Sequence, residues 1–492
     1  MKNSTPAIKI HPDDNVVVAV DDISAGEKIF GVTASQPVKM GHKMAIAPIE
    51  CGGNIIKYGY PIGHAAKSIA PGEHVHTHNI RTNLKGTLEY EYLPKLTEII
   101  PVKDTFMGYL RKDGKVGIRN EIWIVNTVGC VNFPAQKIAQ IAQERYANRN
   151  IDGIFTFAHP YGCSQLGDDH LNTQRILANM VKHPNAGGVL VFGLGCENNT
   201  IESFKETLGT TDSDRVKFLV AQDYEDEIEK ALELIDELVN YAEKYTRSEV
   251  DISNLVIGLK CGGSDGFSGI TANALVGVAS DTLISHGGTA ILTEVPEMFG
   301  AETIFMSRCE SKEIFNATVE MINNFKEYFI RHNQEVYENP SPGNKDGGIS
   351  TLEDKSMGCT QKGGIGNVTD VLDYGQMTTK PGLNLLNGPG NDIVAITNLM
   401  AAGAHMVLFT TGRGTPVGAP IPTIKISSNS NLAKRKSNWI DYNAGQLLEG
   451  KNMDEIGKDF WKTIINIAEG KHARNEENGY REIAIFKDGV TL

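Results

Sequence analysis

The stretch Val189-Leu-Val-Phe192-Gly-Leu-Gly195-Cys196-Glu-Asn-Asn199 places a short apolar run directly before a polar, glycine-rich loop. Five other apolar runs are followed by similar loops: Glu121–Val128, Gly153–Phe157, Leu255–Ile257, Ala290–Leu292 and Met406–Phe409. Between Phe192 and Leu255 a helix is indicated, because Ile228, Leu232, Ile235 and Val239 recur at helical spacing. Strands that alternate with helices are typical of parallel, largely buried sheets. The sequence from Gly108 onward therefore predicts an α/β body.

The N-terminal part has a different sequence pattern, a short internal repeat. The pattern I-x-x-G-x-x-[I/V] occurs three times, at Ile23–Ile29, Ile49–Ile55 and Ile69–Val75. Its glycine permits a turn with positive φ, and its β-branched residues suit strands. We therefore predict a small all-β domain over residues 1–95, a linker at Glu89–Asp104, a middle α/β domain over 105–248 and a C-terminal α/β domain over 249–492. The polar segment Thr246–Ser253 is expected to separate the last two domains.

Composition excludes several classes of protein. The chain has 492 residues, 22% of them charged, and a net charge of -13. This balance argues against a non-specific nucleic-acid binder, which needs a basic face. The N-terminus shows no secretory signal, and no apolar run approaches the ~18 residues of a membrane span. The seven cysteines are an odd number, which suggests reduced thiols in a cytoplasmic protein with no membrane partner.

The loops after the predicted strands hold the candidate site residues. In open α/β sheets ligands bind beyond the carboxyl ends of the strands, so six such loops could line one pocket. We expect His170 and Glu294 to transfer protons, Asp265 to orient or ligate, and Lys362 and Arg413 to meet the carboxylate of an acidic substrate. Glu297 is a further acidic candidate. Asn391, Ser264 and Thr271 complete the predicted substrate-binding set, and the segment Gly388–Asp392 is expected to cap a helix that starts at Ile393. The alternative for each acidic residue is a solvated loop position or a helix cap.

Cysteine and histidine supply candidate metal ligands. Six of the seven cysteines have a glycine neighbour, all except Cys309. We predict Cys130, Cys163, Cys261 and Cys359 as metal ligands, although small thiols also fill gaps in tight loops. The absence of a C-x-x-C pair argues against a structural zinc site. On a strand, His74, His76 and His78 would share one face, with His64 nearby, so His74 and His76 are predicted ligands for a transition metal. The alternative is that these histidines are ordinary surface or core residues.

Many segments in order along the chain match one family: GHKMAI, IKYGYPIG, GEHVHTHNIRTNL, VGIRNEIWI, TVGCVN, YGCSQLGDDH, GLGCENN, CGGSDGFSGITAN, TEVPEMFGAE, GCTQK, GRGTP and REIAIFKDGVTL. Through them the chain resembles the altronate/galactarate dehydratase family. The histidines of GEHVHTHN favour the altronate branch. The resemblance implies a SAF (β-clip) domain ahead of a two-part α/β dehydratase body with parallel sheets. It also implies dehydration of D-altronate to 2-dehydro-3-deoxy-D-gluconate in hexuronate catabolism, stimulated by Fe(II) or Mn(II).

That reaction is a β-elimination. A base removes the C2 proton, a divalent cation stabilises the doubly charged aci-carboxylate, and a second group protonates the departing 3-hydroxyl. Two alternatives stay open: a dehydratase of another sugar acid such as galactarate, and a non-catalytic sugar-acid-binding regulatory protein. The sequence also leaves open whether the body holds one metal ion, an iron–sulfur cluster or neither, and whether the chain forms a homo-oligomer.

Overall fold

The computed structural model describes residues 6–84, 86–336 and 339–492. Its N-terminal domain consists of short antiparallel strands. One sheet has the order β1-β2-β5-β8 and another the order β6-β7-β9, while β3 pairs with β4. The strands are β1 Ala7–Ile8, β2 Val16–Ala19, β3 Lys28–Ile29, β4 Val32–Thr33, β5 Lys43–Ala45, β6 Asn54–Lys57, β7 Tyr60–Ala65, β8 His74–Val75 and β9 Ile80–Arg81. The predicted all-β SAF-type domain is confirmed.

The repeated I-x-x-G-x-x-[I/V] pattern explains how this domain folds. Gly26, Gly52 and Gly72 all have positive φ, and a Cβ on Gly72 would lie 2.1 Å from the Thr33 carbonyl oxygen. The isoleucines and the valine that flank these glycines are buried in two small cores formed by this domain alone. The turns therefore need glycine, and the flanking apolar residues supply the core.

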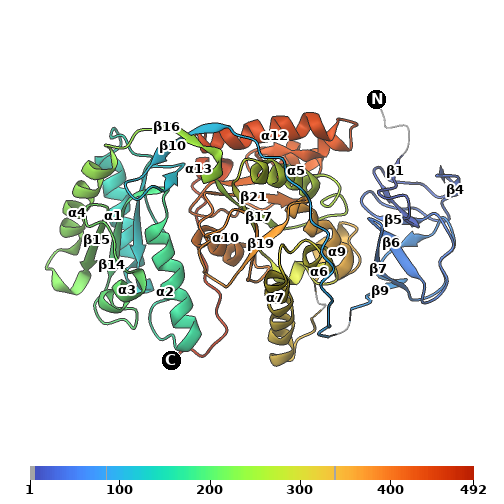
Figure 1. Ribbon diagram of the computed structural model, residues 1–492, viewed down its shortest axis with the longest axis horizontal. Coiled ribbons are helices and arrows are strands. Elements are labelled where there is room, and N and C mark those ends of the chain that lie inside the picture. Colours follow the sequence, from blue (N-terminus) through green and yellow to red (C-terminus); the bar gives the residue numbers. More distant parts are fainter. Residues whose placement is uncertain (1–5, 85, 337–338) are drawn as a thin grey trace.

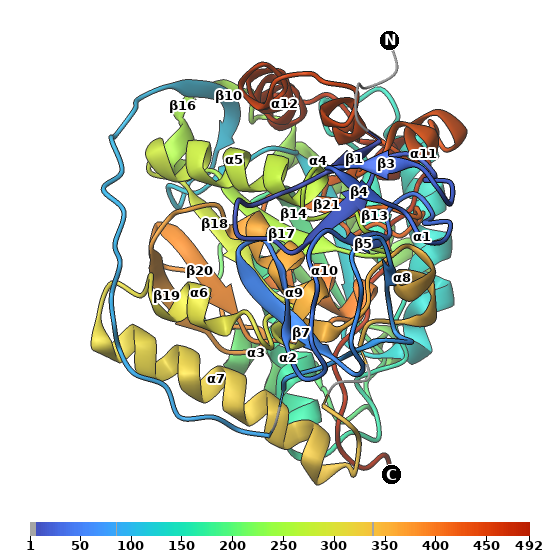
Figure 2. The ribbon, with the colours of Figure 1, turned by 90° about the vertical axis from the view of Figure 1, so that its right-hand side faces the viewer.

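Residues 86–104 contain no helix or strand and run along the C-terminal domain (Figure 2). The backbone amides of Lys95 and Val102 donate to Ser307 and Ser285 of that domain. The Tyr92 hydroxyl donates to the Cys309 carbonyl at 2.9 Å. The predicted linker is therefore an extended segment that is hydrogen-bonded to the C-terminal domain.

The middle domain is a parallel sheet of order β13-β12-β14-β15, covered by helices and standing at one end of the molecule (Figure 1). Its elements are β12 Glu121–Asn126, β13 Ile154–Thr156, β14 Ala186–Gly193, β15 Val216–Val220, α1 Asn132–Arg145, α2 Gly167–Lys182, α3 Ile201–Leu208 and α4 Glu227–Ala242. A small antiparallel ribbon leads to and from this domain: β10 Thr105–Leu110, β11 Val116–Gly117 and β16 Ser248–Asp251. β16 lies inside the segment Thr246–Ser253 and pairs with β10, so this segment is an ordered connection.

The C-terminal domain holds a second parallel sheet, of order β19-β20-β18-β17-β21-β22-β23, in the centre of Figure 1. Its strands are β17 Val256–Cys261, β18 Thr289–Leu292, β19 Val368–Leu372, β20 Gly382–Leu386, β21 Met406–Thr411, β22 Thr423–Ser427 and β23 Tyr442–Asn443. Its helices are α5 Ala272–Ser285, α6 Glu302–Met306, α7 Lys312–Arg331, α8 Pro342–Asp346, α9 Leu352–Thr360, α10 Asp392–Ala401, α11 Ser430–Arg435, α12 Met453–Ala468 and α13 Arg474–Glu477.

The α/β body with parallel sheets is confirmed, but the six strand-end loops do not follow strands of one sheet. Three follow strands of the middle sheet and three follow strands of the C-terminal sheet. Strand order therefore divides the six loops into two groups, one at each sheet. Within the described ranges, no helix is long and apolar enough to cross a membrane.

Candidate active site

A buried group of charged side chains and thiols lies at the carboxyl ends of β17 and β18. Cys261 ends β17, and the short helix η4 Val295–Glu297 follows β18. The thiols of Cys261 and Cys359 both donate to Glu297 Oε2, at 2.8 and 3.0 Å, and their sulfur atoms are 3.4 Å apart. Lys362 Nζ lies 2.8 Å from the Cys261 sulfur and 3.4 Å from Glu294 Oε2. The structure therefore brings together Cys261, Cys359, Glu294 and Lys362, four of the predicted site residues.

Two further lysines and an aspartate complete this group. Lys260 Nζ contacts Glu294 Oε1 at 2.5 Å and Asp392 Oδ1 at 2.7 Å, and Lys355 Nζ contacts Glu297 Oε1 at 2.7 Å. We call these eight residues the thiol–lysine cluster: Lys260, Cys261, Glu294, Glu297, Lys355, Cys359, Lys362 and Asp392. Sequence reasoning missed Lys260 and Lys355. The available signal was Lys260 itself, a charge between the apolar strand residues and Cys261 that needs a buried partner.

Burial and neighbouring charges set the protonation states in the cluster. Burial alone would raise the pKa of Glu297, but Lys355, Lys362 and Lys260 hold it well below its ordinary value. Burial opposes the charge on Lys362, yet the nearby thiols and carboxylates raise its pKa well above the usual value. The hydrogen bond with Cys261 and burial both raise the pKa of the Cys359 thiol. The cluster therefore keeps its lysines charged at neutral pH.

The backbone at Glu294 is unusual. Its φ of 73° lies in the left-handed region, which a side chain other than that of glycine adopts at a cost of about 1–3 kcal/mol. The Glu294 carboxylate is held there by Lys260, by Lys362 and by the Cys261 amide, which donates to Oε2 at 2.9 Å. Such strain is typical of functional sites, where surrounding contacts enforce the geometry.

A cavity of only about 10 Å³ adjoins the cluster at the boundary with the N-terminal domain. Its lining includes Lys57 and Tyr58 of the N-terminal domain with Ser264, Lys355 and Cys359 of the C-terminal domain. The buried Ser264 hydroxyl has no hydrogen-bond partner within the described residues. Because a buried polar group without a partner is costly, Ser264 is a candidate contact for a bound molecule.

Buried ion pairs hold the N-terminal domain at this boundary. Asp354 of α9 accepts from Lys43 Nζ at 2.7 Å and from Lys57 Nζ at 2.9 Å. The two lysines hold the pKa of Asp354 well below its usual value despite burial. Figure 2 shows the strands of this domain lying over α9. The two domains therefore build the cavity together.

Three histidines gather at the same boundary. His42 Nδ1 lies 3.0 Å from His74 Nε2, and the His76 ring stacks on both rings at centroid distances of 4.9 and 5.6 Å. His76 Nε2 donates to the Lys345 carbonyl of α8 at 2.9 Å. Burial and the neighbouring positive groups lower the pKa of His74 to about 3 and that of His76 to about 4, so both are neutral and can ligate a metal.

The expected strand through His74, His76 and His78 is wrong beyond Val75, where β8 ends and a turn begins. The turn still keeps the His78 ring 5.4 Å from that of His74. Sequence reasoning missed His42, because this residue lies far from His74 in the sequence, in the loop directly before β5. His64 lies apart and contacts Asn83.

Several predicted residues have structural contacts instead. Asp265 is fully engaged: its oxygens accept from the Ser428 and Ser268 hydroxyls, the Asn429 amide and the Phe267 backbone. Thr271 donates to the Phe267 and Ser428 carbonyls. These contacts favour an anchoring role for Asp265 and Thr271.

Asn391 caps α10, which begins at Asp392, one residue earlier than expected. Arg413 is exposed, and its Nε lies 3.8 Å from where a Cβ on Gly343 would be, at the start of α8. His170 lies on α2 of the middle domain and contributes no hydrogen bond to the thiol–lysine cluster. The structure therefore leaves His170, Asn391 and Arg413 outside the cluster.

The four predicted cysteine ligands do not form one set. Among the described residues, Cys261, Glu297 and Cys359 are a group whose ligand atoms all lie within 4.8 Å of one another. Cys130 and Cys163 are exposed in loops of the middle domain and belong to the other sheet. The structure therefore places the predicted ligands Cys261 and Cys359 in one group and the predicted ligands Cys130 and Cys163 in another domain.

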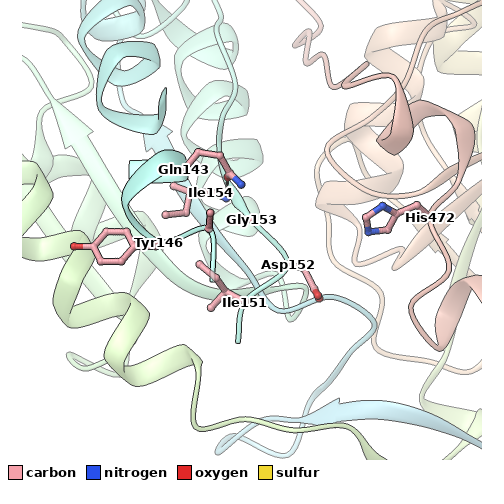
Figure 3. A pocket seen from close by; sticks show the side chains of 8 residues that line it. Gln143, Tyr146, Ile151, Asp152, Gly153, Ile154 and His472 are labelled. Carbon is pink, nitrogen blue, oxygen red and sulfur yellow. Dashed lines mark hydrogen bonds between the residues drawn. The ribbon is translucent and has the colours of Figure 1, made fainter. Parts of the chain in front are cut away.

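Another cavity, of about 270 Å³, lies away from the cluster (Figure 3). Its lining comes mostly from the segment between α1 and β13, with His472 on the facing segment. Asp152 and His472 are the titratable carboxylate and imidazole in this lining. It contains no cysteine and none of the lysines of the cluster, so we do not place the active site there.

The fold and the thiol–lysine cluster define an α/β enzyme with a β-domain at its N-terminus. Family models described as the altronate/galactarate dehydratase SAF domain, the D-galactarate dehydratase/altronate hydrolase second domain and the D-galactarate/altronate dehydratase C-terminal domain match residues 5–83, 108–243 and 252–491. The chain belongs to the altronate/galactarate dehydratase family and is a hydro-lyase.

Its relatives match along their whole length. The altronate dehydratases of Escherichia coli (strain K12) and Bacillus subtilis (strain 168) are 53% and 52% identical to it, over 99% of both chains in each case. Galactarate dehydratase (L-threo-forming) of Escherichia coli (strain K12) is 32% identical over 99% of this chain and 98% of its own. The alternative of a non-catalytic regulatory protein is set aside, since these relatives are enzymes.

Proposed function

We propose that this enzyme dehydrates D-altronate to 2-dehydro-3-deoxy-D-gluconate in hexuronate catabolism, with Fe(II) or Mn(II) as cofactor. The observation that carries the proposal is the thiol–lysine cluster, which places three buried ammonium groups beside three carboxylates and two thiols. The aci-carboxylate formed by removal of the C2 proton carries two negative charges, and buried cations stabilise such an intermediate strongly. The substrate is inferred from the two altronate dehydratase relatives, which are more similar to this chain than the galactarate dehydratase is.

The charge of the cluster fits a divalent cation. Lys260, Lys355 and Lys362 contribute +3, and Glu294, Glu297 and Asp392 contribute -3, so the sum is zero while both thiols are protonated. Loss of both thiol protons would leave -2, which one divalent ion balances. Cys261, Cys359 and Glu297 would hold the ion, and their sulfur atoms favour iron over manganese. When bound, the ion would act as a Lewis acid toward the charge that develops on the substrate.

The side chains around the ion would bind the substrate and transfer protons. Lys355 lines the cavity and can bind the substrate carboxylate, while the unpartnered Ser264 hydroxyl can meet a substrate hydroxyl. Burial raises the pKa of Glu294, which makes it a better base for the C2 proton. Lys362, charged beside Glu294, can protonate the departing 3-hydroxyl. Arg413 near α8 would meet the acid as it enters.

A substrate panel with metal replacement tests the proposal. Purified full-length enzyme should convert D-altronate to the 2-keto-3-deoxy acid faster than galactarate. Chelation should abolish turnover, and Fe(II) or Mn(II) should restore it while Mg(II) alone should not. Full activity after confirmed metal removal would exclude the metal, and preference for galactarate would exclude the substrate assignment.

Location and assembly complete the proposal. All seven cysteines are free thiols, which suits the reducing cytoplasm. We propose that the enzyme acts there on a small-molecule substrate, without nucleic-acid or membrane partners, and its oligomeric state can be measured by light scattering.

A further inference from the structure

Three Gly-Cys pairs follow three neighbouring strands of the middle sheet. Gly129-Cys130 comes after β12, Gly162-Cys163 after β13 and Gly195-Cys196 after β14. Both β13 and β14 pair in parallel with β12, so the carboxyl ends of all three strands meet at one edge. The three cysteines are exposed there. The Gly-Cys motif thus occurs three times at the carboxyl ends of parallel strands, where α/β sheets bind ligands.

The backbone fixes these loops to one another. The Gly129 amide donates to Tyr161, the Asn199 amide donates to Gly162, and the Ser164 amide donates to the Asn198 side chain. Each glycine is required by close packing. A Cβ on Gly129, Gly162 or Gly195 would lie 2.6, 2.0 or 2.7 Å from the nearest atom of a neighbouring segment. The backbone therefore holds the three loops in place, and the Cys163 and Cys196 sulfur atoms accept only long contacts, from the Ser164 hydroxyl at 3.8 Å and the Gln222 amide at 3.7 Å.

Unpaired polar atoms gather at the same edge. Four buried atoms lack a hydrogen-bond partner within the described residues: Asn126 Oδ1 at the end of β12, Thr156 Oγ1 at the end of β13, and Gln165 Nε2 and His170 Nδ1 after Cys163. Buried polar atoms are nearly always paired, so each such atom needs an explanation, such as a missing water or ion. Together they indicate that a bound group belongs at this edge of the sheet.

We propose that Cys130, Cys163 and Cys196 bind an iron–sulfur cluster in the middle domain, separate from the thiol–lysine cluster. Each thiol would release its proton to solvent and bind one iron as thiolate, while two ferrous ions, two ferric ions and four inorganic sulfide ions are supplied from outside. Three cysteines leave one iron of a cubane cluster without a protein thiolate. That iron would have an open position for an oxygen atom, such as the hydroxyl of a hydroxy acid.

The spacing of the three cysteines argues against a single ion. The three sulfur atoms do not all lie within 4.8 Å of one another, whereas the buried group of Cys261, Cys359 and Glu297 meets that limit. A cubane cluster holds its cysteines on different iron atoms and so accepts a wider set. This inference goes beyond the proposed function and does not depend on it.

Anaerobic reconstitution of the full chain with ferrous iron, ferric iron and sulfide tests the proposal. The wild-type protein should bind about four sulfide ions and about five iron ions per chain, one of the iron ions at the thiol–lysine cluster, and gain the visible absorption of a cluster, with an EPR signal after reduction. Cys130→Ser, Cys163→Ser and Cys196→Ser should each lose most of the bound sulfide and the absorption. Cys51→Ser is the matched control, because Cys51 is also exposed beside a glycine but lies in the N-terminal domain, and it should bind the full amount.

Cys261→Ser separates the two sites. It should lower activity and leave the sulfide content unchanged, since Cys261 lies in the other sheet. Wild-type protein that binds iron without sulfide, or a triple Cys130/Cys163/Cys196 serine variant that keeps its sulfide, would overturn the proposal. Neither outcome would affect the test of altronate turnover.

Discussion

At the scale of single residues, Lys362 differs from the other lysines of the thiol–lysine cluster in the atom that it contacts. Its ammonium group donates to the Cys261 sulfur, whereas the hydrogen bonds of Lys260 and Lys355 among the described residues all go to oxygen atoms. An ammonium group beside a thiol stabilises the thiolate, and the thiolate in turn keeps the lysine protonated. Lys362 is therefore positioned both to prepare a metal ligand and to donate a proton.

We predict that Lys362→Gln lowers kcat for D-altronate by about 10²–10⁴-fold, which is typical for loss of a proton-transfer group. Steady-state kinetics and circular dichroism would measure activity and fold. Lys326→Gln is a matched control, because Lys326 is equally buried and pairs with Glu302 at 3.1 Å outside the cluster. The control should lose stability while its folded fraction keeps its kcat. A Lys362→Gln enzyme with wild-type kcat would remove Lys362 from the chemistry.

At the scale of elements, the sequence predicts strands well where they are wholly apolar. The runs before Cys130, Cys196, Glu294 and Thr410 all became buried parallel strands. β20 and β22 were not predicted, because Asn384 interrupts the apolar run of β20 and Lys425 interrupts that of β22. Asn384 bonds Thr378 and Thr369, and the Lys425 ammonium donates to the Val417 carbonyl. Such buried polar residues are tolerated only through tertiary partners, which a local pattern does not contain.

The candidate site follows the same rule. Cys261 and Glu294 could be predicted because they lie at the ends of predicted apolar strands, and Cys359 and Lys362 because they lie in a segment with glycine and cysteine. Their separation from Cys130 and Cys163 could not, because it depends on which strands share a sheet. His42 joins His74 and His76 only through the antiparallel pairing of β5 with β8. Strand pairing between distant segments is thus the information that the local pattern lacked.

A prediction at this scale concerns α9, which carries Asp354. Asp354→Asn would leave Lys43 and Lys57 buried with no carboxylate between them. Loss of one partner from a buried ion pair costs about 3–5 kcal/mol, so the contact between the N-terminal domain and α9 should weaken strongly. Limited proteolysis between the domains and calorimetry would detect this change. Glu243→Gln, which breaks the exposed pair with Arg149, should change stability by less than about 1 kcal/mol. Equal effects of the two substitutions would contradict the role given to Asp354.

At the scale of the whole molecule, the candidate active-site cavity is lined by two domains that have separate cores. The N-terminal domain buries its apolar residues in two clusters of its own. Its contact with α9 is mostly polar, through Lys43, Lys57, the Ile62 carbonyl and Thr82. A domain with its own core and a polar boundary can fold alone. Catalysis, however, should require both parts, since Lys57 and Tyr58 line the cavity together with Ser264, Lys355 and Cys359.

We therefore predict that the chain can be divided after residue 84 into two fragments that restore activity when they are mixed. The fragment 1–84 should give a dispersed NMR spectrum by itself, because its cores are complete. The fragment 86–492 should be nearly inactive alone, since its cavity lacks one wall, and titration with 1–84 should raise turnover of D-altronate to a plateau. The same titration with 1–84 carrying Lys57→Gln should need a higher concentration, because one of the two ion pairs to Asp354 is missing. Full activity of 86–492 alone would show that the N-terminal domain lies beside the active site without forming part of it.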